Sequence, residues 1–183
     1  MKRNKIALSG LALLGAVGLM LAGCSGGGDN GGGSSSGGDA TAIIRTNGSE
    51  PQNPLIPTNT NEVGGGKILD SIFAGLVYYD GTGAPVNDMA ESIVTNDPQN
   101  LTVTLKKGQK FTDGTEVKAD NFIKAWNYGA LLSNAQNASY FFEDIEGFSY
   151  DEDSELTGLE QVDDYTFTIT LNKPAADFAQ RLG

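Results

Sequence analysis

The chain has 183 residues and a formal charge of −11, with a single cysteine and no histidine. An acidic surface argues against nucleic-acid binding, which depends on Lys and Arg neutralising phosphates, and against electrostatic adhesion to anionic lipid. The missing histidines exclude Ser-His-Asp and Cys-His catalytic arrangements and histidine-ligated metal sites. We therefore expect no cofactor and no metal ion, and we interpret the acidity as a source of solubility.

The N-terminus has the layout of a secretory signal peptide. Lys2, Arg3 and Lys5 form a positively charged start, and residues 6–22 are apolar or small apart from Ser9. An uncleaved transmembrane helix is the alternative, but the run is near the minimum of about 17–25 residues needed to span a bilayer.

The signal ends in the string Leu-Ala-Gly-Cys at residues 21–24. This string resembles the lipobox of bacterial lipoproteins. The resemblance implies that residues 1–23 are removed and that the Cys24 thiol carries diacylglycerol. Diacylglycerol contributes two acyl chains, for example palmitate, and two chains hold a protein stably, whereas one alone holds it only marginally.

Residues 24–40 predict a flexible tether, because after Cys24 they are almost entirely Gly and Ser and offer little to bury. Fourteen such residues have a root-mean-square reach of about 20 Å.

Folded sequence is expected from about residue 40. Residues 42–45 predict a short strand, followed by a turn-rich stretch with Pro51 and Pro57. A helix is predicted next, from apolar residues spaced as one stripe; these are Ile68, Leu69, Ile72, Phe73, Leu76 and Val77. Asp80-Gly81 ends this segment with turn residues.

Alternating apolar and threonine residues predict two half-buried strands, over 101–105 and 165–171. Between them, a helix is predicted over 120–132 with Phe122, Ile123 and Trp126 on its inner face. Strands and helices without a regular alternation indicate a mixed α/β (α+β) body.

Two segments resemble binding motifs but fail the tests that matter. Gly64-Gly65-Gly66-Lys67 lacks the earlier Gly and the following Ser or Thr of a phosphate-binding loop, so we predict a loop leading into a helix. The acidic run 151–155 lacks the Gly and Glu that a calcium-binding EF-hand needs at its sixth and twelfth positions, so we predict an exposed acidic loop.

Residues 107–122 form a more specific motif than these two segments. Asp113-Gly114 predicts a tight turn, Phe111 is expected to pack inward, and Asp120 favours the N-terminus of the following helix. This string resembles the signature region of the family 5 extracellular solute-binding proteins, the oligopeptide and dipeptide receptors of ABC importers. Further agreement covers residues 47–50, 54–55, 72–77, 90–92 and 164–174, so that the resemblance extends over about 43–183, essentially the whole folded part.

One departure lies at the start of the predicted helix 120–132. Lys118 stands where the family usually has Thr or Ser, and Asn121 stands where it has a carboxylate. We therefore expect a degraded capping box, which affects local stability by about 0.5–2 kcal/mol.

The resemblance implies the N-terminal part of a two-lobed, type II periplasmic-binding-protein-like fold. Residues 41–63 and 161–183 would form part of lobe I, and residues 64–160 a side domain. In this arrangement the strand 165–171 lacks most of its neighbours and has an uncovered edge. Because family members run to several hundred residues, we expect the chain to supply only the first part of such a receptor.

The resemblance also implies the function. A lipid-anchored receptor on the extracytoplasmic face of the cell membrane would capture an oligopeptide or another small solute. It would deliver this ligand to the permease subunits of an ABC transporter. Backbone groups of Asn61, Glu62 and Val63 and the ring of Tyr140 are the implied ligand contacts, although each residue also has a plain structural role available as loop or packing.

Two other classes stay open at this point. A secreted lipoprotein enzyme, such as a glycoside hydrolase, would need two carboxylates facing one cleft, and no spacing in this chain identifies such a pair. An adhesive surface protein would show repeats or a long stalk, and the sequence shows neither. A receptor without enzymatic activity is the prediction we retain.

Overall fold

The computed structural model describes residue 43 and residues 45–183, of which Arg45–Gly183 form one compact unit. The predicted signal peptide, the Cys24 anchor and the tether lie outside the described residues. Within the described part, no helix is both long and apolar enough to cross a membrane.

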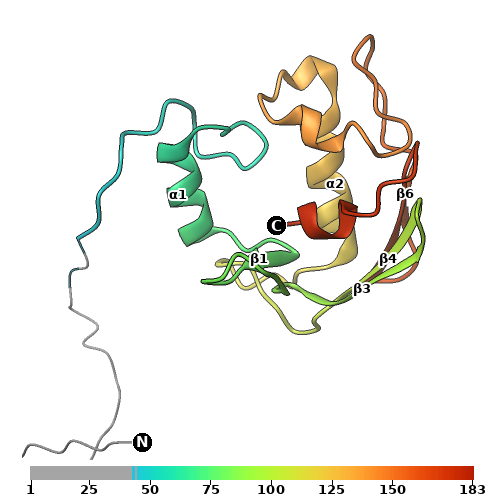
Figure 1. Ribbon diagram of the computed structural model, residues 1–183, viewed down its shortest axis with the longest axis horizontal. Coiled ribbons are helices and arrows are strands. Elements are labelled where there is room, and N and C mark those ends of the chain that lie inside the picture. Colours follow the sequence, from blue (N-terminus) through green and yellow to red (C-terminus); the bar gives the residue numbers. More distant parts are fainter. Residues whose placement is uncertain (1–42, 44) are drawn as a thin grey trace, which may run out of the picture. The chain divides into compact units, whose positions relative to one another are not determined.

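A four-stranded antiparallel sheet forms one side of the unit, at the right in Figure 1. Its strands are β3 (Ala90–Asp97), β4 (Asn100–Leu105), β6 (Thr166–Thr170) and β5 (Leu159–Gln161), and they lie in the order β3-β4-β6-β5. The two alternating segments are therefore confirmed as strands, and they pair directly, with Val103 opposite Phe167.

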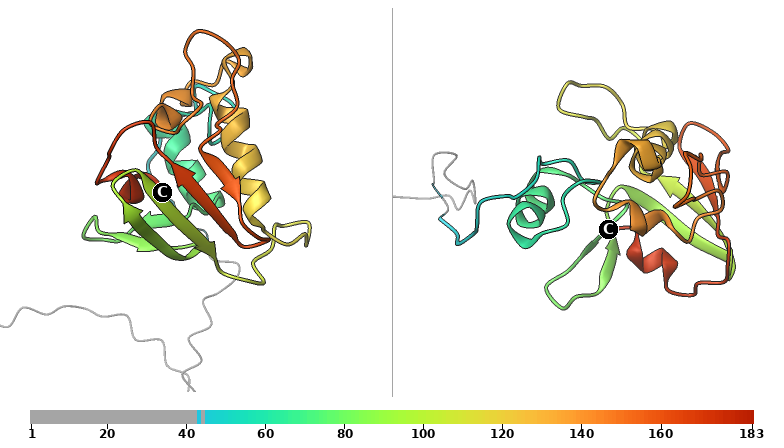
Figure 2. Two further views of the ribbon diagram at one scale, coloured as in Figure 1. Left: turned by 90° about the vertical axis from the view of Figure 1, so that its right-hand side faces the viewer. Right: turned by 90° about the horizontal axis from the view of Figure 1, so that it is seen from above.

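One face of this sheet is covered by α2 (Ala119–Ala130), which runs alongside the strands in Figure 2. Phe122 and Trp126 project from α2 onto the buried Phe167, with ring centroids 6.2 and 5.8 Å from its ring. The predicted inner face of this helix is thus confirmed. Every second residue of β4 and β6 is buried beneath it, as period-2 burial requires.

Shorter elements make up much of the rest of the unit. A hairpin of β1 (Val77–Tyr79) and β2 (Pro85–Asn87) precedes β3. Three 3₁₀ turns follow α2 along the chain: η1 (Leu132–Asn134), η2 (Ser139–Phe142) and η3 (Phe178–Arg181). Phe178 and Leu182 bring the end of the chain into the same apolar core as the sheet.

The first helix differs from its prediction at both ends. α1 spans Val63–Ile72, so that the three glycines expected in a loop are helical, whereas Leu76 and Val77 lie beyond the helix. The Leu76 and Val77 N–H groups both donate to the Leu182 carbonyl. The spacing of these two apolar residues reflects burial in the core after the helix has ended.

Three further expectations are wrong. Phe111 is 46% exposed and does not pack inward, because residues 109–117 form a small hairpin of their own, bridged between Lys110 and Glu116. Strand β6 has no uncovered edge, since β4 and β5 flank it. Ile43 and Arg45, the described residues of the predicted strand 42–45, are not in a strand, and no described segment pairs with them.

Other local predictions are confirmed. Asp113 Oδ1 accepts hydrogen bonds from the Thr115 backbone and hydroxyl at 2.8 and 2.7 Å, and Gly114 has a φ of +88°, so this segment is a tight turn. The acidic residues of segment 151–155 are exposed. The assignment of residues to lobe I and to a side domain stays a prediction.

Candidate ligand-binding site

The segment predicted to meet the ligand forms the start of α1. Asn61 is exposed, Glu62 is the residue that caps the helix, and Val63 is its first residue, with 73% of its surface exposed. Backbone N–H groups of a first helical turn have no partner within the helix and are available to an external acceptor.

The Glu62 carboxylate already satisfies part of this need. Its two oxygens accept from the Gly65 N–H at 3.0 and 2.9 Å, and Oε1 also accepts from the Gln52 N–H at 3.1 Å. The Gly65 hydrogen bond is the main reason that the pKa of Glu62 lies below its ordinary value. This carboxylate therefore holds a negative charge against the helix N-terminus, where such a charge is favoured.

Tyr140 lies in η2 and is 46% exposed. Its ring stacks on that of Phe141 with a centroid distance of 4.5 Å, and Phe141 is itself 57% exposed. Two adjacent aromatic rings therefore face solvent on this turn.

Hydrogen bonds tie the segment before α1 to the segment before η2. Thr58 Oγ1 donates to Gln136 Oε1 at 2.9 Å, and the Thr58 carbonyl accepts from the Ala138 N–H at 2.9 Å. Asn137 Nδ2 donates to the Asn59 carbonyl at 3.2 Å. The two predicted contacts, segment 61–63 and Tyr140, therefore each follow a segment that is hydrogen-bonded to the other.

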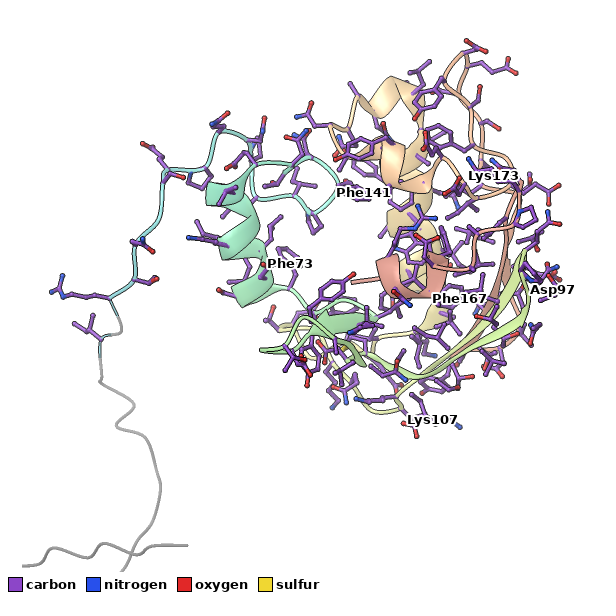
Figure 3. The ribbon with its side chains drawn as sticks, viewed as in Figure 1. Phe73, Asp97, Lys107, Phe141, Phe167 and Lys173 are labelled. Carbon is purple, nitrogen blue, oxygen red and sulfur yellow. The ribbon has the colours of Figure 1, made fainter. Side chains whose placement is uncertain are left out.

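A cavity of about 550 Å³ lies between α1, α2, η2 and η3. Phe73 and Phe141, which are labelled in Figure 3, line it together with Trp126. Its charged lining residues are Asp70 and Arg181, and the Arg181 guanidinium pairs with Asp144 at 2.8 Å. None of Asn61, Glu62, Val63 and Tyr140 lines this cavity.

Sequence reasoning did not predict the cavity. Its walls come from four segments that are distant in the chain, and its aromatic residues also read as ordinary core residues. The pair Phe141-Phe142 was the available signal, because its two rings cannot both be buried on one face of a short turn.

Among the residues that the structure describes, no group of three or more acidic or cysteine side chains is placed to hold a metal ion. The most buried carboxylate of the described part, Asp144, is engaged by Lys173 and Arg181.

Comparison with known proteins defines the class. Residues 84–183 match the family described as "Bacterial extracellular solute-binding proteins, family 5 Middle". The periplasmic oligopeptide-binding protein OppA of Escherichia coli K12 is 30% identical over 98% of this chain and 34% of its own length. The oligopeptide-binding protein OppA of Bacillus subtilis is 27% identical over 69% of this chain and 24% of its own length.

Solved structures agree with this match. Haemophilus influenzae OppA in complex with the peptide RPPGFSPFR is 27% identical, covers 74% of this chain and 28% of its own, and has a TM-score of 0.64. The Escherichia coli murein tripeptide binding protein MppA is 26% identical, covers 72% and 27%, and also has a TM-score of 0.64. The pheromone receptor PrgZ, at 22% identity and a TM-score of 0.68 over 74% and 28%, shows the same fold.

These matches define a class of extracytoplasmic solute-binding proteins with a mixed α/β, periplasmic-binding-protein-like fold. The chain belongs to family 5 of the bacterial extracellular solute-binding proteins. It spans about a third of the length of the Escherichia coli relative. Both the family and the partial two-lobed, type II fold predicted from the sequence are confirmed.

Proposed function

We propose that this chain is part of a lipid-anchored extracytoplasmic receptor that binds oligopeptides and delivers them to an ABC transporter permease. The observation that carries the proposal is the similarity to an oligopeptide-binding protein over 98% of the chain. The receptor captures peptide without chemical turnover, in agreement with the solute-binding character of its family.

In this proposal the backbone of residues 61–63, and not the Glu62 carboxylate, meets the peptide. That carboxylate is occupied by the Gly65 and Gln52 N–H groups, whereas Asn61 and Val63 are exposed beside it. Tyr140 supplies an aromatic surface from η2. In this proposal the two contacts keep a fixed spacing, because the segments before them are hydrogen-bonded to one another.

Calorimetry on the protein expressed from the complete gene tests this function. A set of short peptides should bind with measurable heat, and mass spectrometry of the same samples should recover each peptide intact. Cleavage of the bound peptides would contradict a receptor and favour an enzyme.

The Tyr140 contact has its own test in the same protein. Tyr140→Ala should weaken peptide binding by about 1 kcal/mol, or roughly fivefold, as loss of one aromatic contact does. Tyr128→Ala is the matched control, since Tyr128 on α2 is 48% exposed and Tyr140 is 46% exposed. Equal affinities for the two variants would remove Tyr140 from the proposed site.

Anchoring rests on the lipobox-like string alone and is tested by labelling. Cells fed an alkyne analogue of palmitate should yield a labelled, membrane-associated protein, and Cys24→Ala should abolish both the label and the membrane association. Labelling that survives the substitution would place the lipid on another group.

A further inference from the structure

We infer that Asn47 is a site of spontaneous deamidation, which converts this neutral residue to aspartate and isoaspartate. Asn47 is followed by Gly48, and both are exposed in a segment without helix or strand. The inference is independent of the proposed function, because it depends only on local chemistry and geometry.

The reaction needs a side-chain amide that its neighbour's backbone nitrogen can reach. The Gly48 nitrogen attacks Asn47 Cγ, a C–N bond forms, and the amide nitrogen leaves as ammonia with the proton from the Gly48 N–H. Water then opens the five-membered ring at either carbonyl. Opening at one carbonyl gives aspartate, and opening at the other gives isoaspartate, whose backbone contains one additional methylene group.

The structure leaves this approach open at Asn47. Apart from its two neighbours in the chain, no described residue lies within 4 Å of the place where a Gly48 Cβ would stand, and a residue without a Cβ allows the backbone to adopt the folded geometry of the attack. No hydrogen bond joins the Asn47 side chain or the Gly48 N–H to another described residue.

Two Asp-Gly pairs in the chain show the opposite situation. The Asp113 carboxylate accepts from Thr115 at 2.8 and 2.7 Å, while the Gly114 N–H donates to the Phe111 carbonyl at 2.9 Å. Asp80 is similarly bound to Thr82 and Ala84. Such turns fix the side chain away from the following nitrogen, so they should resist the equivalent rearrangement in the folded protein.

Deamidation at Asn47 should also affect the start of α1. Ser49, two residues after Asn47, lies so close to Gly64 that its Oγ would stand 2.6 Å from a Cβ at that position. An added backbone methylene and a new negative charge at residue 47 would disturb this contact at the first turn of the helix.

Peptide mapping of the intact, folded protein after incubation in mildly alkaline buffer tests the inference. Trypsin releases residues 46–67 as one peptide, which separates Asn47 from the Asn30-Gly31 pair of the tether. Fragmentation should show the mass gain of deamidation at Asn47, and protein isoaspartyl methyltransferase should label the same peptide. Asn53 is an internal control, because the following Pro54 has no N–H with which to attack.

Gly48→Ala is the decisive variant. The glycine does not have a positive φ and its Cβ position is open, so alanine should leave the fold unchanged while it hinders the attack. The deamidated fraction at Asn47 should then fall to that of Asn59 and Asn61 in the same peptide. If Asn47 in the original protein keeps its amide as long as Asn59 and Asn61 do, the inference is wrong.

Discussion

Glu62 shows how a single side chain shapes the candidate site. A glutamate is not a preferred N-cap, since Ser, Thr, Asp and Asn are the usual ones. Here both oxygens of its carboxylate still accept from the Gly65 N–H. That approach requires residue 65 to have no side chain, because a Cβ there would stand 2.5 Å from Glu62 Oε1 and 2.4 Å from Thr60 Cγ2.

A pair of alanine substitutions tests this requirement. Gly65→Ala should destabilise the chain by about 1–3 kcal/mol, because the new methyl group overlaps a capping side chain and a buried threonine. Gly66→Ala is the matched control, since nothing lies within 4 Å of its Cβ position, and it should stabilise α1 by up to about 1 kcal/mol. Urea unfolding of both variants measures the difference, and a loss of stability in both would indicate that the helix tolerates no alanine for another reason.

Asp144 is the second residue with a large local effect. It is buried, and it pairs with Lys173 at 2.9 Å and with Arg181 at 2.8 Å. Its contact with the Lys173 ammonium is the main cause that lowers the pKa of this carboxyl below its ordinary value. The pairing connects η3 to the turn that follows η2.

Replacement of this carboxylate should produce a pH-dependent loss of stability. Asp144→Asn should cost about 1–3 kcal/mol at neutral pH, since it leaves two cations without their anion. A lowered pKa in the folded state stabilises above the unfolded value of about 3.9 and loses that contribution as the pH falls through the folded value.

The difference between the original protein and Asp144→Asn should therefore shrink in acid. Unfolding free energies measured across this pH range check the prediction. Asp177→Asn is the control, because Asp177 is 70% exposed and lies 3.5 Å from Arg181, and it should change stability by less than about 1 kcal/mol. A difference that is constant with pH would mean that Asp144 acts through packing and not through charge.

At the scale of elements, periodicity predicted some segments well. The sequence predicted β4, β6 and α2 because each buries one regular face against the others. Their apolar residues therefore recur at the period of a strand or a helix. β3 was not predicted as a strand. It is an edge strand whose last four residues are exposed, and a strand exposed on both faces carries no alternation.

The start of α2 shows a partial success. The capping box was expected to be degraded, and the structure keeps one of its two hydrogen bonds: the Asn121 side chain accepts from the Lys118 N–H at 2.7 Å. Lys118, which has no acceptor for the return bond, instead reaches Asp164 at 2.7 Å. The helix is therefore capped from within, while the residue at the N-cap connects it to the loop before β6.

Asn121→Ala should lower stability by about 1 kcal/mol, since the Lys118 N–H loses its acceptor. Asn121→Asp keeps an acceptor and adds a negative charge near the helix N-terminus, so it should match or exceed the original stability. Thermal unfolding of the two variants compares them. If aspartate proves as harmful as alanine, the hydrogen bond to Lys118 is not the source of the effect.

At the scale of the whole molecule, the proposed function makes the chain one wall of a binding site. Asn61, Val63 and Tyr140 are exposed, and the segments that precede them are hydrogen-bonded to one another. The chain spans about a third of the Escherichia coli relative. Lobed receptors gain affinity by burying the ligand between two surfaces. A single wall buries too little of a peptide to hold it tightly.

Residues 24–183 by themselves should accordingly bind peptide weakly or not at all. Isothermal titration calorimetry of this purified segment, beside the protein from the complete gene, makes the comparison. Equal affinity in the two proteins would mean that the segment contains the whole site, and the account of a two-walled receptor would then be wrong.

The residue order by itself determined the class of this protein. The missing histidines and the acidic charge are properties of the composition. The lipobox-like string and the motif around Asp113-Gly114 are local patterns. None of the four requires knowledge of the fold. The same holds for β4, β6 and α2, whose burial follows a fixed period. These features predicted a family 5 solute-binding protein with a mixed α/β fold, and the comparisons confirmed it.

Tertiary structure alone decided where the chain's long-range contacts form. It ended α1 before Leu76, placed β6 between β4 and β5, and joined the segment around Thr58 to that around Gln136. Each of these depends on residues far apart in sequence that satisfy one another's backbone groups or bury one another's side chains. The periodicity of the sequence does not predict such long-range contacts, because they depend on which distant residues the fold brings together.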